Sequence, residues 1–311
     1  MIIIPPKLLI KAKMDHKAFV DFGITPELFH LIPNLNNNQR YRYLAHSAPN
    51  DGLLMASDNG ILPLVYYFIS KGANMYNQAM VSAAGGGHLD IVQLMLQLGA
   101  NNYNDAMSLA ARGGHLNIIQ LMLQLGANDY NDAMSLAARG GHLNIVQLML
   151  QLGANDYNDA MVSAAEGGHL NIIQLMLQLG ANNYNDAMVS AAGGGHLDIV
   201  QLMLQLGANN YNDAMVSAAE YGHLDIVKLM LQFNAGGYDY DLAMKYAAEG
   251  DHINVIEFFI KLGVSPKFIL ARPDFYSEEV VNAVRRMIGT SYIGKRKRED
   301  DMEESDKYSR Y

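Results

Sequence analysis

The order of hydrophobic and polar positions in residues 103–129 predicts two short helices joined by a tight turn. In the first, Ala106 to Arg112, the polar residues Asp105, Ser108 and Arg112 fall three and four apart and therefore share one stripe. We expect Asp105 to cap this helix, because its carboxylate can accept a hydrogen bond from a free backbone N–H. The two glycines that follow Arg112 end it.

The second predicted helix runs from Leu116 to Leu125 and is apolar around most of its circumference. Its polar positions are Asn117, Gln120 and Gln124, again three and four residues apart. A helix with so wide an apolar surface must be buried on several sides. Helices of about ten residues are marginal alone, so their stability must come from stacking against neighbours.

The same pattern recurs every 27 residues. Histidines mark the period at positions 88, 115, 142, 169, 196 and 223. Six regular units fill 76–237, a diverged unit follows a two-residue insertion, and another precedes them in the same register. The predicted units are 49–75, 76–102, 103–129, 130–156, 157–183, 184–210, 211–237 and 240–266. A fixed period of this length predicts a solenoid over 49–266, in which each unit buries its apolar surface against the next.

The flanks of the repeats are expected to close the stack. Residues 1–48 are interpreted as an N-terminal helical cap or a small adaptor region. Residues 267–290 are interpreted as a C-terminal helical cap, with Ser277 capping a helix that begins at Glu278. Residues 291–311 are predicted to be a disordered, charged tail.

The segment AARGGHLNIVQLMLQLGAN (137–155) resembles the ankyrin repeat. The matching features are the Ala-Ala pair, the Gly-His-Leu turn, the apolar second helix and the closing Gly-Ala. Two features depart from that family: the usual Thr-Pro-Leu-His start is absent, and the period is six residues shorter than 33. The resemblance implies an all-α solenoid of about eight helix pairs with trimmed β-hairpin fingers and helical caps. Such short, nearly identical arrays look like those encoded by large DNA viruses of protists.

The resemblance also implies a non-catalytic scaffold that binds proteins through the concave face of its first helices, here as a host-directed viral factor. One exposed position near the end of the first helix changes its charge class along the six regular units: Gly85, Arg112, Arg139, Glu166, Gly193 and Glu220. Tyr221 replaces a glycine beside it. The candidate partner-binding residues are therefore Arg112, Arg139, Glu166, Glu220 and Tyr221. The alternative is neutral variation at solvated helix ends.

Net charge and composition argue against a nucleic-acid partner and against cysteine chemistry. The 311-residue chain has a formal net charge of −9, and the span 76–237 alone holds twelve acidic and three basic residues. Such a surface is a poor match for nucleic-acid phosphates. The chain has no cysteine, which excludes disulfides and thiolate catalysis. No sequence pattern for a signal peptide or a membrane span is found, so we expect an intracellular, monomeric protein in the cytoplasm or nucleus.

The repeated histidines and tyrosines each allow two interpretations. The histidines suggest metal ligands, but stacked helices lie about 8–10 Å apart, too far for neighbouring units to share one ion. We therefore expect each histidine to bond backbone and to hold the two helices of its unit together.

A tyrosine also recurs in the loop before each first helix, and it either fills the trimmed loop or belongs to a row for partner binding. These tyrosines are at positions 76, 103, 130, 157, 184, 211 and 240. No nucleotide, metal or catalytic motif is found, so neither a cofactor nor an enzymatic activity is predicted.

Two further hypotheses concern the flanks. Lys295, Arg296, Lys297 and Arg298 form a nuclear-import pattern, with a self-neutralising tail as the alternative because acidic residues follow at once. Residues 1–48 could instead recruit a ubiquitin ligase through a segment similar to an F-box. A third alternative is a structural spacer with no specific partner along the array.

Overall fold

The computed structural model describes residues 48–233, 235 and 239–289. The predicted adaptor region, apart from residue 48, and the predicted tail with its import pattern lie outside these residues. The chain divides into two compact units, Met1–Ala160 and Met161–Tyr311, which are called the N-terminal and C-terminal units below. The described residues contain helices and no strand.

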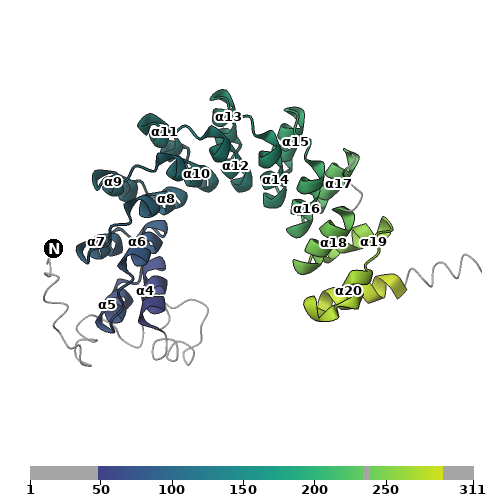
Figure 1. Ribbon diagram of the computed structural model, residues 1–311, viewed down its shortest axis with the longest axis horizontal. Coiled ribbons are helices and arrows are strands. Elements are labelled where there is room, and N and C mark those ends of the chain that lie inside the picture. The colour runs from purple at the N-terminus through teal and green to yellow at the C-terminus, as the bar shows by residue number, and fades with distance from the viewer. Residues whose placement is uncertain (1–47, 234, 236–238, 290–311) are drawn as a thin grey trace, which may run out of the picture. The chain divides into compact units, whose positions relative to one another are not determined.

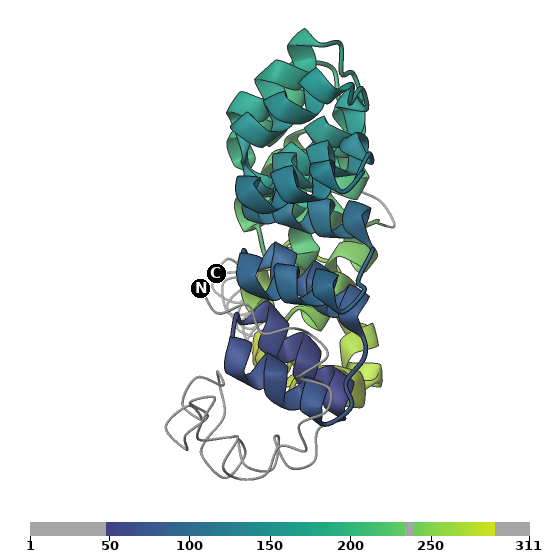
Figure 2. The same cartoon turned by 90° about the vertical axis from the view of Figure 1, so that its left-hand side faces the viewer.

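The N-terminal unit is built from helix pairs (Figures 1 and 2). Its pairs are α4 (Pro49–Asp58) with α5 (Leu62–Ser70), α6 (Tyr76–Gly85) with α7 (Leu89–Gln97), α8 (Tyr103–Gly113) with α9 (Leu116–Gln124), and α10 (Tyr130–Gly140) with α11 (Leu143–Leu152). The division between the units falls inside α12 (Tyr157–Gly167).

The C-terminal unit continues the same pattern after α12. Its helices are α13 (Leu170–Gln178), α14 (Tyr184–Gly194), α15 (Leu197–Gln205), α16 (Tyr211–Glu220), α17 (Leu224–Gln232), α18 (Asp239–Glu249), α19 (Ile253–Lys261) and α20 (Lys267–Ala271). A 3-10 turn (Pro273–Phe275) and a helix over 278–289 follow. Ser277 Oγ accepts a hydrogen bond from the Val280 N–H at 3.2 Å, as expected of a capping serine. The predicted all-α solenoid of helix pairs is confirmed.

Small side chains set how closely the helices stack. In the N-terminal unit the first helices α4, α6, α8 and α10 pack along one another, whereas the second helices α5, α7 and α9 touch at only a few positions. The first helices meet through fully buried alanines, among them Ala110, Ala111 and Ala137. Second helices bury the larger Ile118, Ile119 and equivalent residues. The first helices therefore form the tightly packed layer of the stack.

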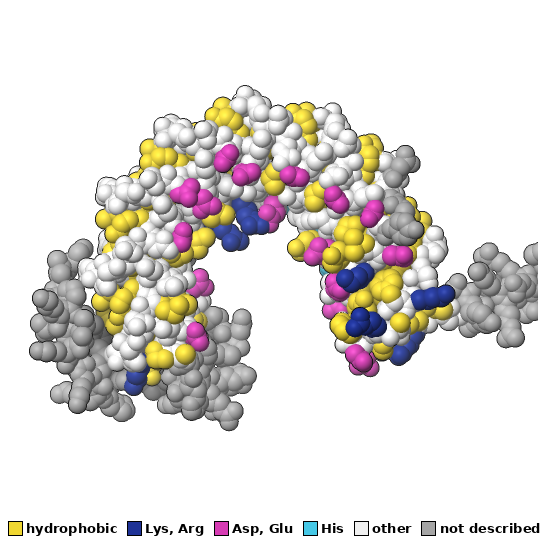
Figure 3. All heavy atoms as spheres, in the orientation of Figure 1, with side chains coloured by type: hydrophobic (Ala, Val, Ile, Leu, Met, Phe, Trp, Pro, Cys, Tyr) yellow, Lys and Arg dark blue, Asp and Glu magenta, His cyan; other side chains and the backbone are white. Residues whose placement is uncertain are grey.

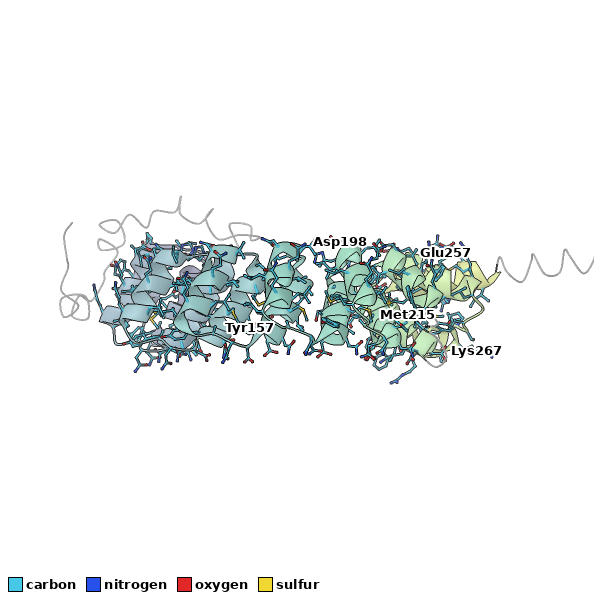
Figure 4. The ribbon with its side chains drawn as sticks, turned by 90° about the horizontal axis from the view of Figure 1, so that it is seen from above. Tyr157, Asp198, Met215, Glu257 and Lys267 are labelled. Carbon is cyan, nitrogen blue, oxygen red and sulfur yellow. The ribbon has the colours of Figure 1, made fainter. Side chains whose placement is uncertain are left out.

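The interior of each repeat is apolar and its edges are polar. Met215 of α16 is fully buried and lies inside the layers of helices, whereas Asp198 at the start of α15 lies at the surface (Figure 4). This division follows the predicted pattern for most positions. Leu125 is an exception, because 39% of its surface is exposed although the pattern predicts a largely buried second helix. It is the C-cap residue that follows the last residue of α9, Gln124.

The predicted start of the first helix is wrong. Helix α8 begins at Tyr103, so Asp105 lies inside the first turn and makes no capping bond. The Asn102 side chain instead donates a hydrogen bond to the Asp105 carboxylate at 2.5 Å. A carboxylate in the first turn also interacts favourably with the positive end of the helix dipole. These interactions allow the helix to start before the predicted cap.

Asparagines bind the short loop that connects successive repeats. Asn104 Oδ1 accepts hydrogen bonds from the N–H groups of Asn128 and Asp129 at 2.8 and 3.2 Å. In the C-terminal unit Asn185 makes the same pair of bonds to Asn209 and Asn210 at 2.7 and 3.1 Å. The side chain thus satisfies backbone donors in a loop too short for a β-hairpin. Sequence reasoning missed this role.

Ser108 is buried rather than part of an exposed polar stripe. It is 2% exposed, and its Oγ has no hydrogen-bond partner among the described residues. Four of the six regular repeats have valine at this position. Ser108→Val is therefore expected to raise the free energy of unfolding by about 1 kcal/mol, measured by urea denaturation. The matched control Ser135→Val, at a half-buried serine in the next repeat, should gain less. Equal gains would show that the buried hydroxyl carries no penalty.

Candidate functional site

The candidate partner-binding residues lie at the ends of first helices. Arg112 and Arg139 are the next-to-last residues of α8 and α10, in the N-terminal unit. In the C-terminal unit, Glu166 is the next-to-last residue of α12. Glu220 is the last residue of α16, and Tyr221 is the C-cap residue that follows it. Arg139 is half-buried, and the other four side chains are exposed. We call the place held by Arg112 in its repeat the variable position.

The structure brings Arg112 and Arg139 onto adjacent helices that pack together. Within the C-terminal unit Glu166 and Glu220 lie on helices α12 and α16, with α14 and its Gly193 between them in the sequence. Figure 3 shows acidic side chains spread along the repeats, whereas basic side chains are few on this face. The variable position thus has a basic character in one unit and an acidic one in the other.

Histidines of the following repeats fix the backbone of the variable position. In the N-terminal unit the Nε2 atoms of His88, His115 and His142 lie 3.0, 3.1 and 3.1 Å from the carbonyl oxygens of Asp58, Gly85 and Arg112, respectively. In the C-terminal unit His196 and His223 make the same contact with Glu166 and Gly193, both at 3.1 Å. A carbonyl oxygen can only accept, so each Nε2 carries a proton and donates.

These bonds confirm that the histidines bond backbone, but the predicted partner was wrong. Each described bond joins a repeat to the one before it, rather than the two helices of one repeat. Spacing within a repeat could not reveal a partner 30 residues away. Among the described residues, no group of three or more His, Asp or Glu side chains is arranged to hold a metal ion.

Tyr221 is the aromatic residue of the candidate set, with 58% of its surface accessible. Its ring lies beside Gly193 of the preceding repeat: a Cβ atom at Gly193 would be 3.5 Å from Tyr221 Cδ2. That distance is an ordinary van der Waals contact, and the closer approach is to Ser217 Oγ, at 2.7 Å. The Tyr221 ring thus lies beside the variable position of the preceding repeat.

Glu249 extends the acidic character of the C-terminal unit. It occupies the variable position of the last repeat, and its carboxylate lies 3.5 Å from Lys245 Nζ, one helical turn earlier. Burial raises the pKa of the Tyr276 hydroxyl, the nearby Glu249 charge raises it further, and Lys245 and Arg272 lower it. Tyr276 thus stays neutral beside this carboxylate at neutral pH.

A second row of exposed residues lies at the opposite ends of the helix pairs, next to the loops. Leu125 and Leu152 of the N-terminal unit are 39% and 38% exposed, and Leu179, Leu206 and Phe233 of the C-terminal unit are 37% to 40% exposed. The repeated tyrosines, from Tyr76 to Tyr240, are half-buried. Tyr211 and Phe233 bring their ring centroids to 5.4 Å. The 27-residue spacing of these leucines was visible in the sequence, but their exposure was not.

Comparison with known protein families agrees with this architecture. A family model described as ankyrin repeats in three copies matches residues 53–133 and 187–268, about half of the chain. The chain belongs to the ankyrin-repeat family. No curated protein sequence matches it.

Ankyrin repeats mediate protein interactions, and proteins built from them are generally non-catalytic scaffolds. This chain's repeats therefore form a protein-interaction scaffold. None of the helices described here has the length and apolar character required to cross a membrane. Within that scaffold, the variable position is one of the places at which otherwise similar repeats differ.

Proposed function

We propose that this ankyrin-repeat scaffold binds its protein partner through the exposed ends of its first helices. The contacting residues are Arg112 and Arg139 in the N-terminal unit and Glu166, Glu220 and Tyr221 in the C-terminal unit. The partner is a protein rather than a nucleic acid, because the repeats are acidic overall.

One observation carries this proposal. At Arg112 and Glu166 a histidine of the following repeat contacts the backbone carbonyl, and the residue at this position differs from repeat to repeat. A side chain on a fixed backbone loses less conformational freedom when it binds, so its contacts contribute more to affinity. The variable position thus combines a backbone held by the next repeat with side chains whose charge differs between repeats.

The viral, host-directed role is the more specific form of the proposal. The ligase-adaptor alternative depends on residues 1–48, and nuclear import depends on Lys295 to Arg298. Both concern residues that the structure leaves undescribed, and both stay predictions. A monomeric state and a cytoplasmic or nuclear location also stay predictions.

Affinity purification with quantitative mass spectrometry, from the cells that make the protein, tests the proposal. The variant combines Arg112→Ala, Arg139→Ala, Glu166→Ala, Glu220→Ala and Tyr221→Gly, the last restoring the residue that the other regular repeats carry. Binding of the principal partner is expected to fall about tenfold or more, because several charged and aromatic contacts are lost together.

The matched control alters exposed glutamines on the second helices: Gln120→Ala, Gln147→Ala, Gln174→Ala and Gln201→Ala. It should retain the partner. Retention of every partner by the first-helix variant would contradict the proposal. Capture of no partner by the unaltered protein would favour the spacer alternative.

A further inference from the structure

Repeat 211–237 differs from the other regular repeats at the end of its first helix. Helix α16 ends at Glu220 and is followed by Tyr221, where each of the other five regular repeats has glycine. The Tyr221 side chain is 58% exposed, and Glu220 is exposed as well. This repeat therefore presents an aromatic ring and a carboxylate in consecutive residues, at the end of the helix pair that lies away from the loops.

Glycines of the preceding repeat border the Tyr221 ring. Residues 193–195 are three consecutive glycines. A Cβ atom at Gly193 would lie 3.5 and 3.6 Å from Cδ2 and Cε2 of the ring. Gly193 occupies the variable position, where four other regular repeats have arginine or glutamate. With glycine there, no side chain of the preceding variable position extends over the ring.

Two further carboxylates lie at the same end of the helix pairs. Asp198 and Asp225 are the second residues of α15 and α17, and both are exposed. Figure 4 shows Asp198 at the edge of the helix layers opposite to Lys267. Asp225 follows Tyr221 by four residues, which limits the distance between their Cα atoms to about 14 Å. One short extended segment can therefore contact Tyr221 and Asp225 together.

The neighbouring cations are engaged elsewhere. The span 184–237 contains one Lys or Arg residue, Lys228, and its Nζ lies 5.5 Å from the centroid of the Phe258 ring in the following repeat. Lys245 of the next first helix pairs with Glu249 at 3.5 Å. Within the described part of the chain, no ion pair or hydrogen bond involves the Glu220 carboxylate. Glu220 is therefore open to a cation from another molecule.

We propose that Glu220, Tyr221 and Asp225, called the Tyr221 patch, bind a basic segment of the partner protein. The inference rests on the proposed function and names the chemistry of the partner at the C-terminal unit. An arginine of the segment stacks on the Tyr221 ring and pairs with the Glu220 carboxylate, because a planar guanidinium can make both contacts. A second basic residue pairs with Asp225. Charge complementarity attracts the segment, and the aromatic ring fixes where it binds.

Selection of a phage-displayed library of random 12-residue peptides on the full-length protein tests this inference. Selected peptides are expected to be rich in basic residues, with Arg favoured over Lys. Fluorescein-labelled copies are then used to measure affinity by fluorescence polarisation. Tyr221→Gly should weaken binding about fivefold, whereas Tyr221→Phe keeps the ring and should bind within about twofold of the unaltered protein. Glu220→Gln with Asp225→Asn should weaken binding about tenfold or more.

These variants are expected to fold. Glycine and asparagine are the residues that other regular repeats carry at the positions of Tyr221 and Asp225. The matched control, Asp186→Asn with Asp213→Asn, removes two negative charges at the loop ends of α14 and α16. The two carboxylates accept hydrogen bonds from the side chains of Asn183 and Asn210 at 2.6 and 2.8 Å, and an asparagine oxygen can accept the same bonds. The control should bind within about twofold of the unaltered protein.

Several outcomes would overturn the inference. Failure to enrich basic peptides would do so, as would equal weakening in the control, which would show attraction to net charge alone. Binding that appears only after Lys295, Arg296, Lys297 and Arg298 are changed to alanine would also do so, because this chain's own basic stretch would then occupy the patch. Peptides without basic residues that are lost on Tyr221→Gly would overturn it and leave the proposed function intact. Peptides insensitive to every first-helix change would count against both.

Discussion

Replacing Gly114 with alanine is expected to lower the free energy of unfolding by about 3 kcal/mol. Gly114 has φ of 81°, a region that is unfavourable for residues with a Cβ. A Cβ atom there would lie 2.5 Å from His142 Cε1, so the ring must move. Its hydrogen bond to the Arg112 carbonyl would then be lost. Backbone strain and the loss of this bond between repeats act together.

Gly126→Ala is the matched control for this change. Gly126 has φ of 100°, but apart from the glycine itself and its two chain neighbours no heavy atom lies within 4 Å of the place its Cβ would take. Alanine there should cost about 1 kcal/mol, from backbone strain alone. Urea denaturation followed by circular dichroism measures both values. Equal losses in the two variants would show that the histidine contact contributes nothing to stability.

In the last repeat, a residue other than glycine occupies the position of Gly114. Asp251 occupies the position that corresponds to Gly114 and has φ of 61°, the one non-glycine residue with positive φ in the described part of the chain. No further repeat of this type follows it in the sequence, so no histidine needs the space of its side chain. Backbone strain alone is tolerated there, which agrees with the small cost expected at Gly126.

The repeat period, the helix pairs and the residues with changing charge could all be predicted from the sequence. They depend on spacing, which a chain of near-identical units displays directly. The start of α8 could not, because it depends on the bond between Asn102 and Asp105 and not on a single capping residue. The partner of His142 could not either, since the carbonyl of Arg112 belongs to another repeat. Contacts between repeats are set by stacking geometry, which residue pattern alone does not specify.

The candidate site shows the same limit. Comparison of the repeats was enough to single out Arg112 and Glu220, because their position near the end of the first helix is Gly, Arg or Glu in different regular repeats. That the backbone at Arg112 is held by a histidine, and that Leu109 lies beside Gly85, required coordinates. The sequence therefore identified which residues differ, and the structure showed which contacts hold the backbone there.

Replacing Ala218 with leucine should destabilise the C-terminal unit by about 3 kcal/mol. Ala218 is fully buried in α16, which packs against α14 on one side and α18 on the other. Three additional carbon atoms cannot fit between helices that approach through alanine, so α16 must shift away from a neighbour. Because each repeat is stabilised mainly by its neighbours, such a shift weakens the interfaces with adjoining repeats and not one contact alone.

Ala271→Leu provides the matched control, because Ala271 ends helix α20 at an exposed position. The same chemical change there should alter stability by less than about 0.5 kcal/mol. Hydrogen exchange then separates local from global effects: Ala218→Leu should reduce protection in α14, α16 and α18 more than in the helices of the N-terminal unit. Unchanged protection in α14 and α18 would contradict the view that close packing of first helices transmits stability between repeats. The proposed binding surface requires that the layer of first helices be rigid. The same experiment therefore tests whether the helices that carry the variable positions are held in place by their neighbours.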